Sequence, residues 1–439
     1  MADPRAQPVS RTGVAAPKFS DKELYRLAEQ YGTPYYLIDE ATLRKKVSEI
    51  EQAFAEFRGA FRVAYSVKAN FNPTVIRTFA SEGIMFDLTA PSELEFVTRA
   101  GGSAESVMYT SITETLAEYE QILRRGVRKI VVASHNGFVN LAEAAARANV
   151  EVKVMIRVNP EVHVHAELRG SMGHGKFGLQ FNGGSHDSAF FVLKRLLATP
   201  GLKFEGFHFH LGSQIEDPSC YAEAIEKLEA FILDARRQLG PFPVRTIDIG
   251  GGLPAAYGRK VPTPKDLGAR LVGQLNSLVE SLGDRFTLVA ESGRFLTAEA
   301  MVMVTRIVNV KGFGEGKYVY VDAGYHMLLD AALLRHEYPV EVVPGGRQAP
   351  QKVVLVGRLC DPLDVFPTSS RSKLGGAEVG KLVLFRDVGA YSIVMNMPFH
   401  SQPRPYVLFR SAQNGFSVAR KGQSVDRLFM DEGGDSLSN

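Results

Sequence analysis

The chain has 439 residues, 45% of them hydrophobic and 23% charged, a composition typical of a globular protein and not of a disordered one. Its 51 basic and 48 acidic residues leave a net charge of +3, and no long Lys/Arg run marks a nucleic-acid surface. Two cysteines, Cys220 and Cys360, are too few for a disulfide framework, and no apolar stretch reaches the roughly 18 residues of a membrane span. We expect a cytoplasmic protein that binds neither nucleic acid nor membrane.

The N-terminal region, residues 1–40, is predicted to hold a tail and one strand. Residues 1 to about 20 are rich in Pro, Ala and Ser, which is typical of a chain end that frays. The run YYLID at 35–39 predicts a strand that either covers the end of the next domain or pairs with a later sheet. We assign it to the later sheet.

Residues 41–290 alternate between short apolar runs and amphipathic stretches. Helical candidates such as 73–83, 91–102 and 221–240 end at a Gly that suits a helix C-cap. Eight strands are predicted, at 61–67, 84–88, 106–110, 129–133, 153–158, 204–210, 245–249 and 287–291. Eight strand–helix units in succession favour a closed (β/α)8 TIM barrel, because an open doubly wound sheet more often stops near five or six strands.

The remainder of the chain, residues 291–420, is predicted to form an all-β domain. Its apolar runs are short and are separated by Gly and Pro. They lie at 301–310, 317–324, 339–343, 352–357, 381–389, 391–397, 406–411 and 415–421. The last segment, 421–439, is rich in Gly, Ser and Asp and is predicted to be a disordered tail.

Reactive residues gather where the predicted barrel strands end. Barrel enzymes carry their chemistry on the loops that follow the strands, so these positions are the informative ones. They are occupied by Lys68, Asp87, Arg157, His208, His210, the triple glycine 250–252, Glu291 and Arg294.

The triple glycine follows the seventh predicted strand. Without a Cβ, such a turn can bring backbone N–H groups close to an anion, and barrels often hold a phosphate after strands seven and eight. A tight turn without a ligand is the alternative, but the position favours phosphate. Asp248, just before the glycines, is expected to orient the loop.

Lys68 follows an otherwise apolar strand. Burial there would lower the pKa of its amine and favour Schiff-base chemistry, although a lysine at a strand end is more often simply solvated.

His208 and His210 are two residues apart, so they share one strand face while Phe207 and Phe209 share the other. Such a pair can bind a metal, and His163 and His165 form a second one, but packing is the commoner role of a barrel histidine.

Glu291 and Arg294 lie three residues apart after the eighth strand and could form a simple ion pair. Alternatively, the carboxylate could hold a ring nitrogen protonated. A phosphate turn, a Schiff-base lysine and an acid for a pyridinium nitrogen together indicate pyridoxal 5′-phosphate, an electron sink for a Cα carbanion.

The chain resembles the fold-type III pyridoxal-phosphate decarboxylases, the group that contains diaminopimelate decarboxylase and eukaryotic-type ornithine decarboxylase. The resemblance spans about residues 30–415 and implies an alanine racemase-like barrel followed by a β domain. Its motifs are AYSVKAN (64–70), FDLTAPSELE (86–95), KFG (176–178), FHFHLGSQ (207–214), DIGGGLP (248–254), ESGR (291–294), VDAGYH (321–326), GRLCDPLD (357–364) and VGAYS (388–392).

The resemblance implies roles for single residues. Lys68 would carry the cofactor as a Schiff base, His210 would stack on its ring, Glu291 would pair with the ring nitrogen, and Arg157 would lie near the 3′-hydroxyl. The remaining cofactor-binding positions would be Asp87, Ser213, Gly250, Gly251, Gly252, Arg294 and Tyr391.

A second set of implied roles concerns catalysis and the substrate. Cys360 would protonate Cα after carbon dioxide leaves, and Asp361 would contact the substrate's distal end. Both would reach across a two-fold interface, so the resemblance implies a homodimer with composite active sites. Asp330, Arg294 and Tyr391 complete the predicted substrate-binding set, and no metal is expected.

Departures from the family pattern bear on the substrate. ESGR replaces the usual EPGR, and Asp330 stands where diaminopimelate decarboxylases carry an arginine for the distal carboxylate. Asp361 replaces a glutamate, as in ornithine decarboxylases, whereas FHSQPRP at 399–405 is closer to the diaminopimelate branch. An acidic pair suits a cationic distal amine, unless Arg335 or Arg358 replaces the missing arginine.

The leading hypothesis is therefore a decarboxylase that removes the α-carboxylate of an amino acid with a polar distal group. Candidate substrates are diaminopimelate, lysine, ornithine, or a carboxylated diamino-acid conjugate such as a siderophore intermediate. An amino-acid racemase on the same fold is the first alternative. A metal-dependent barrel hydrolase built on the histidine pairs is the second, but it leaves Lys68 and the triple glycine without a role.

Overall fold

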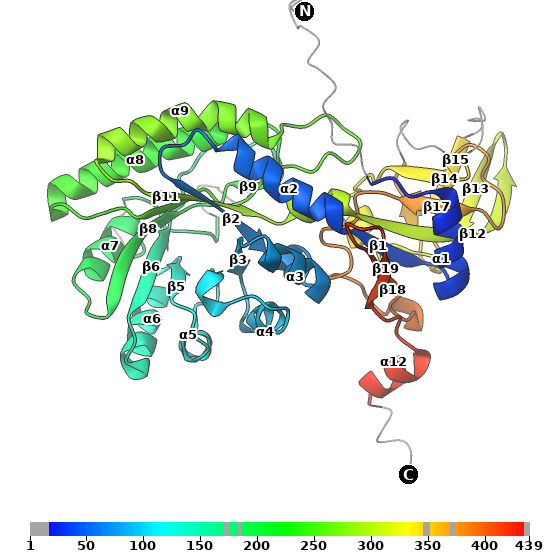
Figure 1. The fold of residues 1–439 in the computed structure, drawn as a ribbon, viewed down its shortest axis with the longest axis horizontal. Coiled ribbons are helices and arrows are strands. Elements are labelled where there is room, and N and C mark those ends of the chain that lie inside the picture. The colour runs from blue at the N-terminus through cyan, green and yellow to red at the C-terminus, as the bar shows by residue number, and fades with distance from the viewer. Residues whose placement is uncertain (1–16, 170–174, 183–185, 346–351, 369–373, 434–439) are drawn as a thin grey trace, which may run out of the picture.

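The computed structural model describes residues 17–169, 175–182, 186–345, 352–368 and 374–433, and within them it shows a barrel joined to a large sheet (Figure 1). Eight parallel strands close the barrel in the order β10-β11-β2-β3-β4-β5-β6-β8, which confirms the predicted fold class. Their bounds are Ala60–Ser66 (β2), Met85–Leu88 (β3), Val107–Tyr109 (β4), Lys129–Val132 (β5), Val152–Arg157 (β6), Leu202–His208 (β8), Thr246–Asp248 (β10) and Thr287–Ser292 (β11).

Helices surround the barrel, and the helix that completes their ring precedes the first barrel strand instead of following the last one. Strand β11 is followed only by the single turn α10 (Arg294–Thr297), so an eighth long helix after the last strand is not formed. Helix α2 (Glu40–Ala53), which precedes β2, packs against both α9 and α3 and completes the ring. The other barrel helices are α3 (Pro73–Ser81), α4 (Pro91–Arg99), α5 (Leu116–Arg124), α6 (His135–Ala148), α7 (Ala189–Leu197), α8 (Ser219–Leu239) and α9 (Pro264–Leu282).

The barrel interior changes character along its axis. Met108, Val131 and Met155, from three neighbouring strands, form a buried apolar cluster inside it. On the outer face, Phe207 of β8 packs edge-to-face on Phe231 of α8 at 5.6 Å. Because parallel strands are buried on both faces, their sequences read as continuous apolar runs, which is why they were predictable. Polar side chains therefore concentrate at the strand ends.

The second part of the fold is a nine-stranded sheet with the path β16-β15-β13-β12-β1-β18-β19, to which β14 and β17 are added. Strand β1 (Tyr35–Asp39) lies inside this sheet, antiparallel to β12 and parallel to β18. The other strands are β12 (Met301–Phe313), β13 (Gly316–Val321), β14 (Val340–Val343), β15 (Lys352–Val356), β16 (Val365–Phe366), β17 (Leu382–Phe385), β18 (Tyr406–Arg410) and β19 (Phe416–Arg420).

Smaller elements complete the chain. Helix α1 (Asp21–Tyr31) buries Leu24 and Leu27 against this sheet. A two-stranded ribbon, β7 (Ala166–Arg169) with β9 (Gly212–Ile215), lies beside the barrel, and the short helix α11 (Leu329–Leu333) follows β13. Among the described residues, no helix is both long and apolar enough to cross a membrane.

Two predictions for the C-terminal half are wrong. Residues 391–397 form turns and no strand, because Tyr391 has a left-handed backbone (φ 56°) that breaks the extended pattern. Part of the predicted disordered tail is the helix α12 (Val425–Asp431), where the Ser424 side chain accepts a hydrogen bond from Arg427 N and caps the first turn. Residues 1–16 and 434–439, also predicted to fray, lie outside the described residues.

Candidate active site

Lys68 stands at the strand ends of the barrel, in the turn Val67–Ala69 that follows β2. Its Nζ lies 3.5 Å from Oδ2 of Asp87, near the end of β3. The Lys68 side chain is 41% exposed, whereas the side chain of Asp87 is 1% exposed. The lysine therefore reaches into open space beside a fully buried acid.

The charge state of Lys68 differs from the prediction. Burial alone would lower the pKa of its amine, but the carboxylates of Asp87 and Glu291 outweigh burial and raise that pKa above its ordinary value. The expectation of a lowered pKa is therefore wrong, because it considered the apolar strand and not the acids that other strands bring nearby. Lys68 is held as an ammonium group.

Three further polar groups meet beside Lys68. His208, Asp248 and Glu291, at or near the ends of β8, β10 and β11, offer ligand atoms that all lie within 4.8 Å of one another. His208 Nε2 is 3.2 Å from Glu291 Oε1, but the two atoms form no hydrogen bond. Burial raises the pKa of Asp248 and of Glu291 and lowers the pKa of His208 well below its ordinary value.

Several buried atoms of this cluster have no hydrogen-bond partner. They are Asp87 Oδ1, Asp248 Oδ2, Glu291 Oε1 and both ring nitrogens of His208. A buried polar group left without a partner costs about 1–3 kcal/mol, so their concentration in one region indicates a place prepared for a polar ligand.

The triple glycine adopts a conformation that other residues would strain. Gly250 and Gly252 have φ of 69° and 119°, and a Cβ on Gly250 would lie 2.4 Å from the carbonyl oxygen of Phe209. Gly250 N–H donates to Asp248 Oδ1 at 2.7 Å, which confirms that Asp248 holds this loop. Gly251 N–H donates to His210 Nδ1 at 3.0 Å. No described residue accepts a hydrogen bond from the N–H of Gly252.

His210 is fixed by that contact. Because Nδ1 accepts a hydrogen bond from Gly251, Nε2 carries the ring proton of the neutral imidazole. Burial and the nearby charge of Lys68 lower the pKa of His210 well below its ordinary value, so the ring is neutral. A neutral, oriented ring suits packing against an aromatic ligand.

Arg294 brings together residues that are far apart in the sequence. Its Nε donates to Ser213 Oγ at 3.3 Å, and its guanidinium lies 4.8 Å from the ring centre of Tyr391. Nη1 donates to the Tyr257 hydroxyl at 2.9 Å and is 3.8 Å from Asp330 Oδ2. Arg294 and Asp330 are both buried, so Asp330 is an acidic partner of this arginine.

Arg157, at the end of β6, is also buried near the acids. Its guanidinium lies 4.8 Å from the ring centre of Phe177, in the KFG segment. Burial lowers its pKa below the ordinary value, while Glu291 and Asp87 oppose that shift.

Two residues of the site were not identified from the sequence. Tyr257 lies in the loop after β10 and binds Arg294, and His336 packs edge-on against Tyr257 with ring centres 4.1 Å apart. Neither stands in a motif or at a strand end, so no sequence pattern marked them.

Cys360 and Asp361 stand apart from the Lys68 cluster. Cys360 is exposed, and Asp361 Oδ2 accepts a hydrogen bond from the Tyr325 hydroxyl at 3.0 Å. The contacts of the described residues join neither of them to Lys68, Glu291 or His210. A single chain therefore assembles the predicted cofactor residues without these two.

The site combines a lysine in open space, buried acids without partners, and a glycine turn near an arginine. These features are those of a barrel enzyme that carries its cofactor on a lysine. Residues 40–298 match the family model for the pyridoxal-binding domain of pyridoxal-dependent decarboxylases, and the chain belongs to this family.

Relatives agree over nearly the whole chain. The diaminopimelate decarboxylase of Neisseria meningitidis serogroup A is 30% identical over 411 residues, which are 93% of this chain and 96% of that protein. The solved diaminopimelate decarboxylase of M. jannaschii superposes with a TM-score of 0.86 at 26% identity and covers 93% of both chains. The lysine/ornithine decarboxylase of Vibrio vulnificus shares the fold, with a TM-score of 0.75 at 23% identity.

The protein is thus a pyridoxal-phosphate-dependent carboxy-lyase that acts on an amino acid, which sets aside the racemase and the metal hydrolase. The residues fit the cofactor, because Glu291 and Asp87 offer unpartnered buried oxygens and the glycines leave room that a Cβ would fill. The absence of a metal stays a prediction, since His208, Asp248 and Glu291 are spaced closely enough to bind one.

Proposed function

We propose that the enzyme removes the α-carboxylate of an amino acid whose distal group donates hydrogen bonds, and that Asp330 selects that group. The observation that carries this proposal is the buried pair of Arg294 and Asp330, with Nη1 and Oδ2 3.8 Å apart. Asp330 offsets the charge of Arg294, so this end of the site attracts an amine or amide N–H more than a lone carboxylate. Lysine, ornithine, diaminopimelate and carboxylated diamino-acid conjugates all carry such a group.

Pyridoxal phosphate, when bound, supplies a ring that withdraws the electrons left on Cα when carbon dioxide departs. Lys68 would hold the cofactor through Nζ, and Asp87, whose Oδ2 lies 3.5 Å from that atom, would accept the proton that the ammonium group releases. Glu291 holds a proton for the ring nitrogen, which suits a carboxyl whose pKa burial has raised. His210 would pack on the ring, and Arg157 would bind near its hydroxyl.

The phosphate end of the site is proposed to lie at the glycine turn. Gly252 offers an N–H group for it, while Gly250 and Gly251 shape the turn through Asp248 and His210. Arg294 supplies the positive charge, and Ser213 and Tyr391, which both contact this arginine, supply the remaining polar atoms.

A homodimer is proposed to complete the site. Cys360 is exposed, and Asp361 accepts a hydrogen bond from the backbone N–H of Leu363, whose side chain is 57% exposed. Tyr325, which donates to Asp361, has its ring centre 6.2 Å from that of Phe399, which is 39% exposed. Burying this surface against a second copy would deliver the Cys360 thiol to Cα as a proton donor and Asp361 to the distal group. Both cysteines are unpaired, which supports the proposed cytoplasmic location.

The test is carbon dioxide release by the cofactor-loaded enzyme from meso-diaminopimelate and from both enantiomers of lysine and ornithine, with Asp330→Asn beside the wild type. The variant frees the guanidinium of Arg294 for a distal carboxylate, so we expect its preference to move towards diaminopimelate by about tenfold.

A matched control is Asp39→Asn, since Asp39 forms another buried pair, with Arg410 at 2.7 Å, in the second part of the fold. It should keep the wild-type preference. An unchanged preference in Asp330→Asn would overturn the role of Asp330, and no release from these amino acids or from Nε-succinyl-lysine would overturn the proposed activity.

A further inference from the structure

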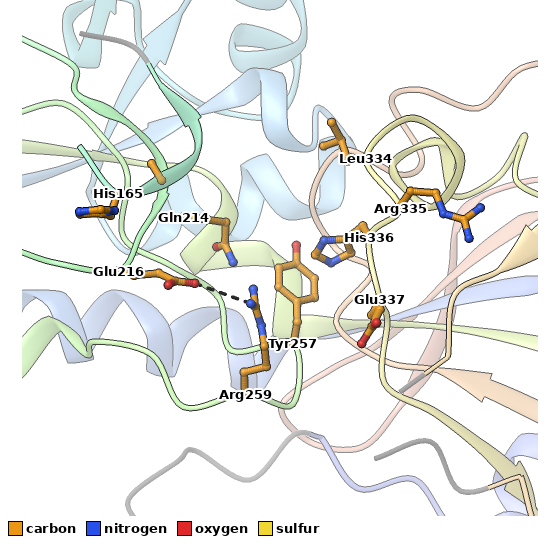
Figure 2. Close-up of a pocket in the computed structure, with 10 residues that line it drawn as sticks. His165, Gln214, Glu216, Tyr257, Arg259, Leu334, Arg335, His336 and Glu337 are labelled. Carbon is orange, nitrogen blue, oxygen red and sulfur yellow. Dashed lines mark ion pairs between the residues drawn. The ribbon is translucent and has the colours of Figure 1, made fainter. Parts of the chain in front are cut away.

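A pocket of about 560 Å³ opens between the barrel mouth and the β domain (Figure 2). The barrel contributes Gln214 and Glu216 from the segment of β9 and Tyr257 and Arg259 from the loop after β10. The other wall is the segment Leu334–Glu337 after α11. This volume lies within the roughly 300–1,000 Å³ of ordinary small-molecule sites.

The pocket shares a wall with the candidate active site. Tyr257 lines the pocket with its ring, and its hydroxyl accepts the hydrogen bond from Arg294. Gln214 lines it next in sequence to Ser213, which accepts the other hydrogen bond of Arg294. His336, whose backbone N–H donates to the carbonyl of Asp330, closes the same corner. A single layer of side chains therefore lies between the pocket and Arg294.

Arg259 is the cationic group directed into this space. Figure 2 shows its side chain extending towards Glu216 and the tyrosine, whereas Arg335 turns its guanidinium to the opposite side. The Arg259–Glu216 pair is long, 3.6 Å, and both side chains are about half exposed, at 44% and 59%. Such pairs are worth about 0–1 kcal/mol, so a ligand can displace Glu216 at little cost. No described residue accepts a hydrogen bond from the Arg259 guanidinium.

The charge balance of the pocket limits its ligand. Glu216 and Glu337 face Arg259 and Arg335 on its walls, so the formal charges of these four side chains cancel, and a single carboxylate meets less repulsion from the two glutamates than a dianion would. A planar guanidinium also matches a carboxylate with two parallel hydrogen bonds. Gln214 is already satisfied, because both ends of its amide bond to Ala255.

We propose that this pocket is an outer subsite that binds a carboxylate carried on an arm beyond the distal nitrogen of the substrate, with Arg259 as the residue that recognises it. The proposal rests on the proposed function and narrows it. The substrate class becomes a diamino acid whose distal amine is acylated by a dicarboxylic acid. Asp330 accepts the amide N–H, and the arm passes Tyr257 into the pocket.

The experiment compares two synthetic substrates that differ only in the terminal charge, Nε-succinyl-lysine and Nε-butanoyl-lysine, each in both enantiomers. The measured quantity is the ratio of their kcat/KM values for carbon dioxide release. We expect the wild type to favour the succinyl compound by about tenfold and Arg259→Gln to bring the ratio near one. Arg335→Gln is the matched control and should keep the wild-type ratio. A ratio of one in the wild type, or an equal loss in both variants, would overturn the subsite.

A binding measurement separates this proposal from the activity on which it rests. N-succinylcadaverine and N-butanoylcadaverine lack the α-carboxylate, so their calorimetric binding to the cofactor-loaded protein needs no turnover. Tighter binding of the succinyl amine by the wild type, lost in Arg259→Gln, supports the subsite even if no amino acid releases carbon dioxide. Equal binding of both amines overturns it even if decarboxylation is established.

Discussion

Two lysines of this protein, Lys46 and Lys68, each have a buried acidic partner, and they differ in how far they are themselves enclosed. Lys46 Nζ lies 2.7 Å from Glu299 Oε2 and over the ring of Phe295 at 4.3 Å, and its side chain is 3% exposed. Lys68 Nζ lies 3.5 Å from Asp87 Oδ2 with a side chain that is 41% exposed. The first lysine is enclosed by its partners, whereas the second faces open space.

The acids around the two lysines differ in the same way. The other oxygen of Glu299 accepts a hydrogen bond from Ala256 N–H at 3.3 Å, so that carboxylate is held on both sides. Near Lys68, Asp87 and Glu291 each keep a buried oxygen without a partner. A satisfied buried pair maintains the packing between helix α2 and the segment after α10, whereas an unsatisfied one is maintained for a ligand.

The largest effect is expected at Lys68. Lys68→Ala should lower carbon dioxide release by more than about 1,000-fold and remove the absorbance of the covalently held cofactor, while the melting temperature of the cofactor-free protein stays within a few degrees. The control is Lys203→Ala, a lysine on β8 with 60% exposure that should change neither quantity. Full turnover by the Lys68 variant would contradict its assignment.

Lys46 should behave in the opposite manner. Lys46→Met leaves the carboxylate of Glu299 buried without its cation, so the free energy of unfolding in urea should fall by about 3–5 kcal/mol. The folded fraction should still bind the cofactor with the wild-type absorbance. The double variant Lys46→Met/Glu299→Gln removes both charges and should recover most of the loss. A Lys46 variant that is stable but cannot bind the cofactor would abolish the distinction between the two lysines.

The smallest effect is expected at Asp387, which belongs to the Lys46 cluster. Burial and the nearby Glu299 raise the pKa of Asp387 from 3.8 to about 7, while Arg386 and Lys46 act in the opposite direction. Because the folded state holds this proton more tightly than the unfolded state, stability falls as pH rises from about 4 to about 7.

Asp387→Asn cannot lose a proton, so its advantage over the wild type should grow from about 1 kcal/mol at pH 4.5 to at most about 4 kcal/mol at pH 8. Urea unfolding of both proteins across this pH range measures the difference. A constant difference would show that Asp387 does not titrate in that interval.

Much of the fold could be predicted because parallel barrel strands are buried on both faces, so that each appears in the sequence as a continuous apolar run. The same logic places reactive residues at strand ends, and Lys68, Asp87, His208, Asp248 and Glu291 were found there and do converge. The eighth helix was not predictable, since α2 fills its place from the other end of the barrel domain. Residues 391–397 were misread because β-propensity does not reveal a left-handed residue.

The sequence alone determined the barrel, the all-β region and the family, since these depend on local pattern and on motifs in a fixed order. Only the tertiary structure decided the charge of Lys68 and the partners of Arg294. Both depend on carboxylates or hydroxyls that arrive from distant segments, Glu291 for the first and Tyr257 and Asp330 for the second. Electrostatic energies depend on the distance between charges in space and on how far those charges are removed from water. The spacing of residues along the chain determines neither quantity.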